Sequence, residues 1–167
     1  MSSDYQGTDI MSGALCNKVH SSSLGEELNE QEAEVIADIM GVRELKDKDK
    51  LVTQNDSIHT LFILIEGKLS VIAGNDEKIV YTMTEGECAG TRAFVDRKPR
   101  RATLRAEGDA LVYTLDPNDF ESLLVKYPII VYKVMRALFR ITHTNLLRMN
   151  QESQLLSNYI SKSQGRF

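Results

Sequence analysis

The sequence predicts a single domain that is mainly β, with helices on either side of the strands. The chain has 167 residues, enough for one hydrophobic core but short for two. From Val42 to Leu115, β-branched segments of period two are broken by turn residues about every eight to twelve positions, which is typical of a small antiparallel sandwich or barrel. A short amphipathic segment comes before these strands, and roughly thirty residues with a helical pattern follow them.

The first part of the chain divides into an arm and a capped helix. Residues 1–26 are rich in Ser, Gly and Asp without clear periodicity, so we expect a loose arm with about one helical turn at most. The segment LNEQEAEVIADIM follows, where Asn29 is placed to cap a helix and Glu32 to complete a capping box. Val35, Ile36 and Ile39 then share one face, which predicts a short amphipathic helix.

The strands are predicted from alternation and from the turns that separate them. Glu66-Gly67, between two apolar runs, is typical of a hairpin turn that needs a glycine at positive φ. The expected strands are Val42–Leu45, Leu51–Gln54, Thr60–Ile65, Lys68–Ala73, Ile79–Met83, Ala102–Ala106 and Ala110–Leu115. Together with the short helices beside them, they give a roll over residues 27–127.

Helical structure is predicted again after the last strand. Asp116 can cap a short helix in which Pro117 takes the first position. Residues 128–167 then form a long helix, expected from Pro128 to about Ile160, and a tail. Spacings of four and three place one stripe on this helix: Met135, Phe139, Thr142, Leu146, Met149, Ser153, Leu156 and Ile160. The stripe fits packing on the chain's own domain or a homodimer, and we favour the homodimer because a small roll cannot cover so long a helix.

Composition excludes several classes of protein. A formal net charge of −4 argues against general nucleic-acid binding, which depends on many phosphate contacts. The apolar runs are too short for a membrane span, and the N-terminus lacks the pattern of a signal peptide. We therefore expect a cytoplasmic protein with no nucleic-acid or membrane partner, in which Cys16 and Cys88 are free thiols.

No catalytic or metal-binding constellation stands out. Cys16 and His20 could share a helical face, but no second Cys or His pair accompanies them, so we expect no metal site. His59 and His143 have no neighbour that suggests a base or a nucleophile, and the sequence contains no P-loop or dinucleotide fingerprint. The sequence therefore predicts that the protein is not an enzyme.

Basic residues gather in one stretch. Residues 90–106, GTRAFVDRKPRRATLRA, hold six of the chain's 20 Lys and Arg residues. The small residues Gly90 and Ala93 would let a phosphate approach the backbone at the start of a helical turn, and an arginine near Pro99 could clamp it. The alternative is a solvated basic loop, which composition alone favours.

The same stretch resembles the phosphate-binding cassette of cyclic nucleotide-binding domains. The residues that carry the resemblance are Gly86–Phe94 and, behind Pro99, Arg100–Thr103. The apolar hairpin Leu61–Val71 and the helical tail extend it over most of residues 28–150. The chain looks like a stand-alone bacterial-type member of this family, which includes catabolite activator proteins and kinase regulatory subunits. The resemblance implies an antiparallel double-stranded β-helix, a jelly-roll or cupin-like β-roll, with an N-terminal helix and a long C-terminal helix.

The resemblance also implies a ligand and its site. Arg100 stands where the family arginine binds the cyclic phosphate, and Ala93 and Phe94 stand where backbone amides reach it. Arg101 is expected to face solvent. The predicted ligand-binding residues are Gly90, Thr91, Arg92, Ala93, Phe94, Arg100, Arg101, Ala102 and Thr103. The cassette is degenerate, because Thr91 replaces the glutamate that holds the ribose 2′-hydroxyl and Ala89 replaces an aromatic residue.

Two functions follow from the resemblance. The first is a regulatory module that binds cyclic AMP, cyclic GMP or a similar small phosphate, needs no other cofactor, and signals through its C-terminal helix to a second copy or a separate protein partner. The second is an interaction scaffold with the same fold that has lost cyclic nucleotide binding. Arg100 favours the first function, and Thr91 favours the second.

Overall fold

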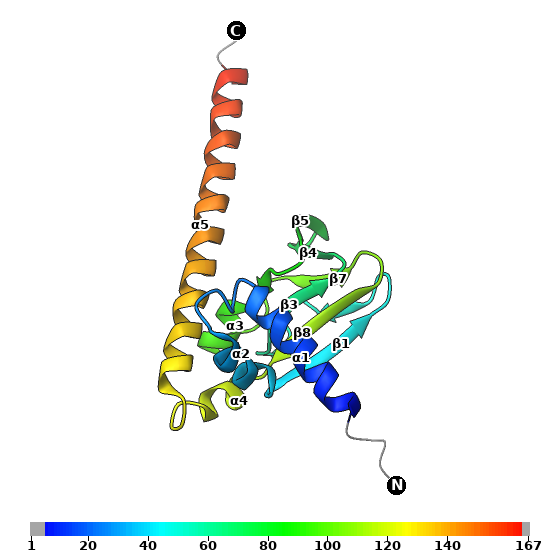
Figure 1. Ribbon diagram of the computed structural model, residues 1–167. Helices are drawn as coiled ribbons and strands as arrows, with labels where there is room; N and C mark the ends of the chain where they lie inside the picture. The colour runs from blue at the N-terminus through cyan, green and yellow to red at the C-terminus, as the bar shows by residue number, and fades with distance from the viewer. Residues whose placement is uncertain (1–5, 165–167) are drawn as a thin grey trace.

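The computed structural model describes residues 6–164, in which two small sheets are flanked by helices (Figure 1). The helices are α1 (Gln6–Ser21), α2 (Glu30–Ala37), α3 (Thr91–Asp96), α4 (Pro117–Ser122) and α5 (Pro128–Gln164). The strands are β1 (Met40–Leu45), β2 (Lys50–Val52), β3 (Leu61–Glu66), β4 (Leu69–Ala73), β5 (Lys78–Met83), β6 (Cys88–Ala89), β7 (Thr103–Ala106) and β8 (Ala110–Leu115).

The strands form two antiparallel four-stranded sheets. One sheet has the order β1-β8-β3-β6 and the other has the order β2-β7-β4-β5. Every predicted strand is present within one or two residues of its expected bounds, and the two-residue strand β6 was not predicted. Gly67 has the expected positive φ, +90°, but the prediction of a hairpin at this turn is wrong, because β3 and β4 lie in different sheets and do not pair with each other. The turn at Gly67 instead carries the chain from one sheet to the other. The predicted mainly β fold with flanking helices is therefore confirmed.

Strand β3 lies at the centre of the core because both of its faces are buried. Phe62 and Leu64 point into the roll, where they pack with Leu69 and Val112 between the two sheets. The other side chains of the strand, those of Leu61, Ile63 and Ile65, belong to a second cluster, the helical cluster, which packs between the sheet and the helices. This explains why the sequence of β3 is continuously apolar, whereas a strand with one solvent-exposed face would alternate apolar and polar residues.

The prediction of a loose arm over residues 1–26 is wrong for residues 6–21, which form α1. Val19 is completely buried, and Leu15 and Cys16, three and four residues before it, are half-buried against the same helical cluster. Packing stabilises this helix although Gly and Ser in its sequence are weak helix formers. The spacing of these three residues was the signal that the sequence reading missed.

Helix α2 begins as predicted and is tied to α5. Asn29 Oδ1 accepts a hydrogen bond from the Glu32 amide at 2.9 Å, and Glu32 Oε2 accepts one from the Asn29 amide at 3.0 Å. The same glutamate pairs with Lys133 Nζ at 2.7 Å, and Glu27 pairs with Arg136 at 3.2 Å. Ion pairs therefore hold α2 and the segment before it against the first half of α5.

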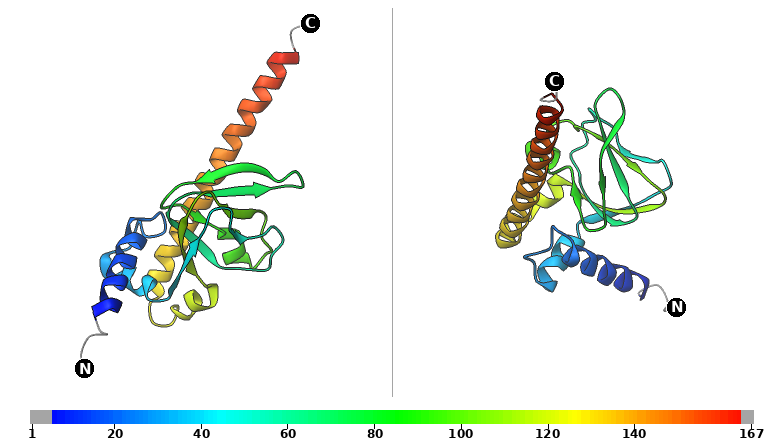
Figure 2. Two further views of the ribbon diagram at one scale, coloured as in Figure 1. Left: turned by 90° about the vertical axis from the view of Figure 1, so that its right-hand side faces the viewer. Right: turned by 90° about the horizontal axis from the view of Figure 1, so that it is seen from above.

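Helix α5 has a packed half and a projecting half. Asp116 caps α4 as predicted, and α5 follows from Pro128. The α5 residues Val131, Val134 and Leu138 are buried in the helical cluster. Its second half extends away from the rest of the molecule (Figures 1 and 2). In the described part of the chain, no helix combines the length and the apolar character needed to cross a membrane.

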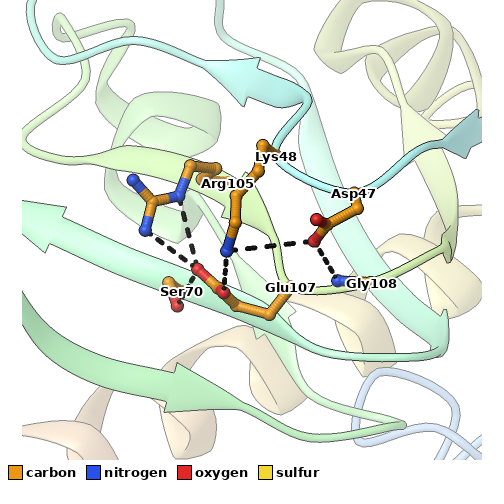
Figure 3. A network of polar contacts seen from close by, with 6 residues as sticks. All are labelled: Asp47, Lys48, Ser70, Arg105, Glu107 and Gly108. Atoms are coloured by element: carbon orange, nitrogen blue, oxygen red, sulfur yellow. Dashed lines mark hydrogen bonds and ion pairs between the residues drawn. The ribbon is translucent and has the colours of Figure 1, made fainter.

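A polar network joins the turn before β2 to the sheet beside it (Figure 3). Glu107 lies at its centre and accepts hydrogen bonds from Lys48 Nζ at 2.8 Å, from Ser70 Oγ at 2.9 Å and from Arg105 Nη2 at 3.0 Å. These donors, Lys48 first, lower the pKa of Glu107 to about 2. The network fixes one end of the roll through charge-assisted hydrogen bonds.

Candidate functional site

A cavity of about 600 Å³ lies between the sheet β2-β7-β4-β5, the segment 88–102 and α5. The sheet contributes an apolar wall that includes Val52, Val71, Met83 and Leu104. Polar groups are concentrated on the other two sides. An apolar pocket of this size with a few grouped polar side chains is typical of a small-molecule site.

The turn before α3 gives the cavity its backbone donors. Gly90 has φ +89°, a left-handed conformation that favours glycine, and no side chain caps the helix that starts after it. The amides of Thr91, Arg92 and Ala93 consequently have no acceptor within their own helix. These residues line the cavity, so their part of the backbone can face an anion there.

Arg100 lies beside this turn and is almost completely buried, with 5% of its surface exposed. Its Nη2 donates to the Thr60 carbonyl, and its Cζ lies 4.8 Å from the centre of the Phe62 ring. Its Nε is buried and has no hydrogen-bond partner among the described residues. Burial lowers the pKa of Arg100 to about 10, so the side chain still carries a charge at neutral pH.

Gly90 and Arg100 are in direct contact across the cavity floor. A Cβ atom added to Gly90 would overlap Arg100 Nη1 and would lie 3.0 Å from Arg100 Cζ. The glycine is therefore needed both for its backbone conformation and for the space that the guanidinium group occupies. This contact brings the two predicted halves of the cassette together.

Most of the predicted site residues line the cavity. Gly90, Thr91, Arg92, Ala93, Arg100, Arg101 and Ala102 all do so. Arg101 is exposed, as expected, but it also borders the cavity, so its side chain is not simply turned away from a ligand.

The remaining two predicted residues do not line the cavity. The buried Phe94 ring packs on Phe120 at 5.4 Å between ring centres, and the Phe94 amide donates to the Gly90 carbonyl at 2.9 Å. Thr103 Oγ1 accepts a hydrogen bond from the Gln54 amide at 2.9 Å. The structure therefore places neither residue in the cavity wall, and a contact of either one with the ligand stays a prediction.

Helix α5 supplies a wall that the sequence reading missed. Four residues of α5 line the cavity: Asn145, Arg148, Met149 and Glu152. They continue, toward the C-terminus, the side of the helix that is buried in its first half. Polar residues that interrupt an apolar face at spacings of three and four were the available signal. Met149, placed in the dimer stripe from sequence, is therefore shared with the cavity.

Two contacts connect α5 to the roll at the cavity. The Arg148 guanidinium lies 3.7 Å from the centre of the Tyr81 ring, and the Tyr81 hydroxyl donates to Glu87 Oε1 at 2.6 Å. The hydroxyl oxygens of Thr91 and Thr142 are 3.4 Å apart. The position of α5 is thus linked to the first residue of α3.

Cys88 also lines the cavity. Burial raises the pKa of this thiol to about 11, which keeps it protonated and a poor nucleophile. Among residues 6–164, no group of three or more His, Cys, Asp or Glu side chains is placed to hold a metal ion. The arrangement offers a buried cation and free amides to an anionic ligand.

Comparisons with known proteins agree with this geometry. Residues 42–127 match the family described as cyclic nucleotide-binding domain. A curated relative, the cAMP-dependent protein kinase regulatory subunit of Hypocrea atroviridis, is 27% identical over 97 residues, which are 58% of this chain and 21% of that protein. The chain thus spans about a fifth of the length of this relative.

Solved structures show the same fold. A cyclic nucleotide-binding domain from Methylobacillus flagellatus superposes with a TM-score of 0.76 at 20% identity, covering 90% of this chain and 85% of that one. The regulatory subunit of a cAMP-independent protein kinase A from Trypanosoma brucei gives a TM-score of 0.72 at 17% identity, covering 89% and 51%.

Proposed function

The chain belongs to the cyclic nucleotide-binding domain family, and on that premise we propose that it is a regulatory module that binds cyclic AMP, cyclic GMP or a similar small phosphate. The observation that carries the proposal is Arg100, a buried cation whose Nη1 lies against Gly90 at the uncapped start of α3. Its Nε has no hydrogen-bond partner among residues 6–164. A phosphate at this position would receive both a guanidinium fork and backbone amides.

Helix α5 is the proposed output of the module. It lines the cavity, contacts Tyr81 through Arg148 and reaches Thr91 through Thr142. If a ligand binds more tightly when α5 is in one position than when it is in another, binding shifts the equilibrium toward the first position. The size of the shift is set by the difference between the two affinities. The surface offered by the projecting half of α5 would change accordingly.

Isothermal titration calorimetry with cyclic AMP and cyclic GMP tests the proposal. Arg100→Ala should weaken binding by roughly 1.5 to 3 kcal/mol, because the lost hydrogen bonds are charge-assisted. Arg43→Ala is the matched control, since Arg43 is an exposed arginine of β1 outside the cavity. Equal losses from the two variants would show diffuse charge attraction and would refute the assignment of Arg100.

The second candidate is an interaction scaffold that has lost cyclic nucleotide binding. Thr91 favours it, because a short neutral hydroxyl replaces the carboxylate expected from the family. The structural likeness to a subunit described as part of a cAMP-independent kinase also favours it. A thermal-shift titration separates the two functions, since a ligand at about 100 times its Kd should stabilise the fold by about 2.7 kcal/mol. No response to any cyclic mononucleotide or small phosphate would favour the scaffold.

We also propose that the exposed stripe of α5 forms a homodimer. Phe139 is 72% exposed, Leu146 53% and Leu156 62%, and large apolar stripes of this kind are rare on monomers. Packing against the same stripe of a second copy would cover these side chains. A separate protein partner is the other proposed occupant.

Several expectations from the sequence stay predictions. They are that the protein has no enzymatic activity, no nucleic-acid or membrane partner and no other cofactor, and that it is cytoplasmic.

A further inference from the structure

Arginines surround the cavity on several sides. Arg92 comes from α3, Arg100 and Arg101 from the segment before β7, and Arg148 from α5. Arg100 is buried at the cavity floor, while Arg92 and Arg101 are exposed. Four guanidinium groups from three parts of the chain therefore border one space.

These four arginines differ from most others in the chain. Within residues 6–164, none of them makes an ion pair with a carboxylate. In contrast, four arginines away from the cavity do form ion pairs with glutamates: Arg97, Arg105, Arg136 and Arg140. The chain has 24 Asp and Glu residues against 20 Lys and Arg, so acidic partners are not scarce. Unpaired arginines are thus concentrated where a ligand would bind.

Carboxylates do not balance this charge inside the cavity. Two acidic residues, Glu87 and Glu152, line it. Both oxygens of Glu87 already accept hydrogen bonds, one from Tyr81 and the other from Thr84. Thr91, which lies at the start of α3, is neutral. Four arginines thus face two carboxylates, which leaves the lining with two positive charges in excess, whereas the phosphodiester of a cyclic mononucleotide supplies one negative charge.

Building on the proposed function, we infer that the cavity prefers a nucleotide with a second phosphate group over the cyclic mononucleotide of the same base. Arg100 and the start of α3 would hold one phosphate. Arg92, Arg101 and Arg148 would be available to the second, because planar guanidinium groups suit phosphate oxygens. A cavity of about 600 Å³ lies well inside the range of sites for larger ligands.

The test compares adenine nucleotides that differ in phosphate charge. Calorimetry would measure the Kd of cyclic AMP, of cyclic di-AMP and of adenosine 3′,5′-bisphosphate at low and high salt. At least one two-phosphate ligand should bind about tenfold tighter than cyclic AMP at low salt, as expected for added charge-assisted contacts. This advantage should shrink in about 1 M salt, where screening acts within roughly 3 Å.

Variants locate the effect. In the triple variant Arg92→Gln, Arg101→Gln, Arg148→Gln, the two-phosphate ligand that binds the parent most tightly should bind about as tightly as cyclic AMP, so that the ratio of these two affinities is close to one. Arg43→Gln should keep the ratio, because Arg43 lies outside the cavity and its guanidinium donates to the Leu51 carbonyl at 3.4 Å. A triple variant that keeps the full advantage would overturn the inference. If that variant does not fold, the ratio of the unmodified chain and its salt dependence decide.

The outcomes separate the two proposals. Cyclic AMP binding as tightly as both two-phosphate ligands overturns the inference and leaves the proposed function standing. A two-phosphate ligand that binds tighter than cyclic AMP at low salt and loses this advantage at high salt supports the inference. No binding by any of the three nucleotides overturns the inference, and the proposed function is then decided by the separate titration with cyclic GMP and small phosphates.

Discussion

Gly90→Ala tests the geometry of the site most directly. The added methyl group would overlap Arg100 Nη1 and would lie 3.2 Å from the Thr60 carbonyl oxygen. The φ of +89° also costs a residue with a Cβ roughly 1–2 kcal/mol. The guanidinium can escape the overlap only by leaving Thr60 and Phe62, which we expect to cost about a further 1–2 kcal/mol. The free energy of unfolding should therefore fall by about 2–4 kcal/mol.

Gly86→Ala is the matched control. Gly86 has nearly the same φ, +87°, but an added Cβ would meet nothing within 4 Å. The Gly86→Ala variant should therefore lose only the backbone contribution, roughly 1–2 kcal/mol of the free energy of unfolding, and should keep its affinity for a phosphate ligand. Gly90→Ala should bind that ligand about ten- to a hundredfold more weakly, because Arg100 is displaced.

Two measurements check this prediction. Urea unfolding followed by circular dichroism gives the two free energies of unfolding, and calorimetry with a phosphate ligand gives the two affinities. If Gly90→Ala and Gly86→Ala lose the same stability and bind equally well, the contact between Gly90 and Arg100 does not shape the site.

Three further predictions concern other parts of the molecule. Thr91→Glu should tighten binding of cyclic AMP about tenfold by calorimetry if the ribose hydroxyl lies at this position, whereas an affinity no better than that of Thr91→Gln would place the hydroxyl elsewhere. Glu107 has its pKa lowered from 4.5 to about 2, so its contribution to stability is present above about pH 4.5 and is lost as the pH falls toward 2. Glu107→Gln should therefore be less stable than the parent at pH 6, with the difference in urea unfolding narrowing by pH 3; a constant difference would contradict this. Leu146→Asp with Leu156→Asp should make a dimer monomeric in sedimentation equilibrium while Leu155→Asp, on another side of α5, should not, and a parent that is already monomeric at tens of micromolar would end the dimer proposal.

Local signals predicted the parts of the fold that depend on near neighbours. The capping box of Asn29 and Glu32 joins residues three apart, and the turn at Gly67 joins two strands that are consecutive in the sequence. The floor of the site was also predictable, since the motif around Gly90 and Arg100 lies within eleven residues. These features require only spacing and residue type.

Contacts between distant parts of the chain could not be predicted in the same way. The wall formed by Asn145 and Arg148 depends on the direction in which α5 leaves α4, which periodicity does not specify. The burial of α1 depends on the cluster that receives Val19, and the sequence of α1 alone is a poor helix former. Phe94 and Thr103 match the motif by position, but the Phe94 ring packs on Phe120 and the Thr103 hydroxyl accepts a hydrogen bond from the Gln54 amide, so neither residue lines the cavity.

The length of α5 makes it a lever. From Thr142, where it meets the start of α3, about 22 further residues extend to Gln164, or roughly 33 Å at 1.5 Å per residue. A tilt of about 10° around Thr142 would carry the far end through about 6 Å. Arg148, which lines the cavity about 9 Å along the helix from Thr142, would move by about 1.6 Å, so the displacement is almost fourfold larger at the tip. The geometry converts an adjustment the size of a bond length into a movement that another macromolecule can detect.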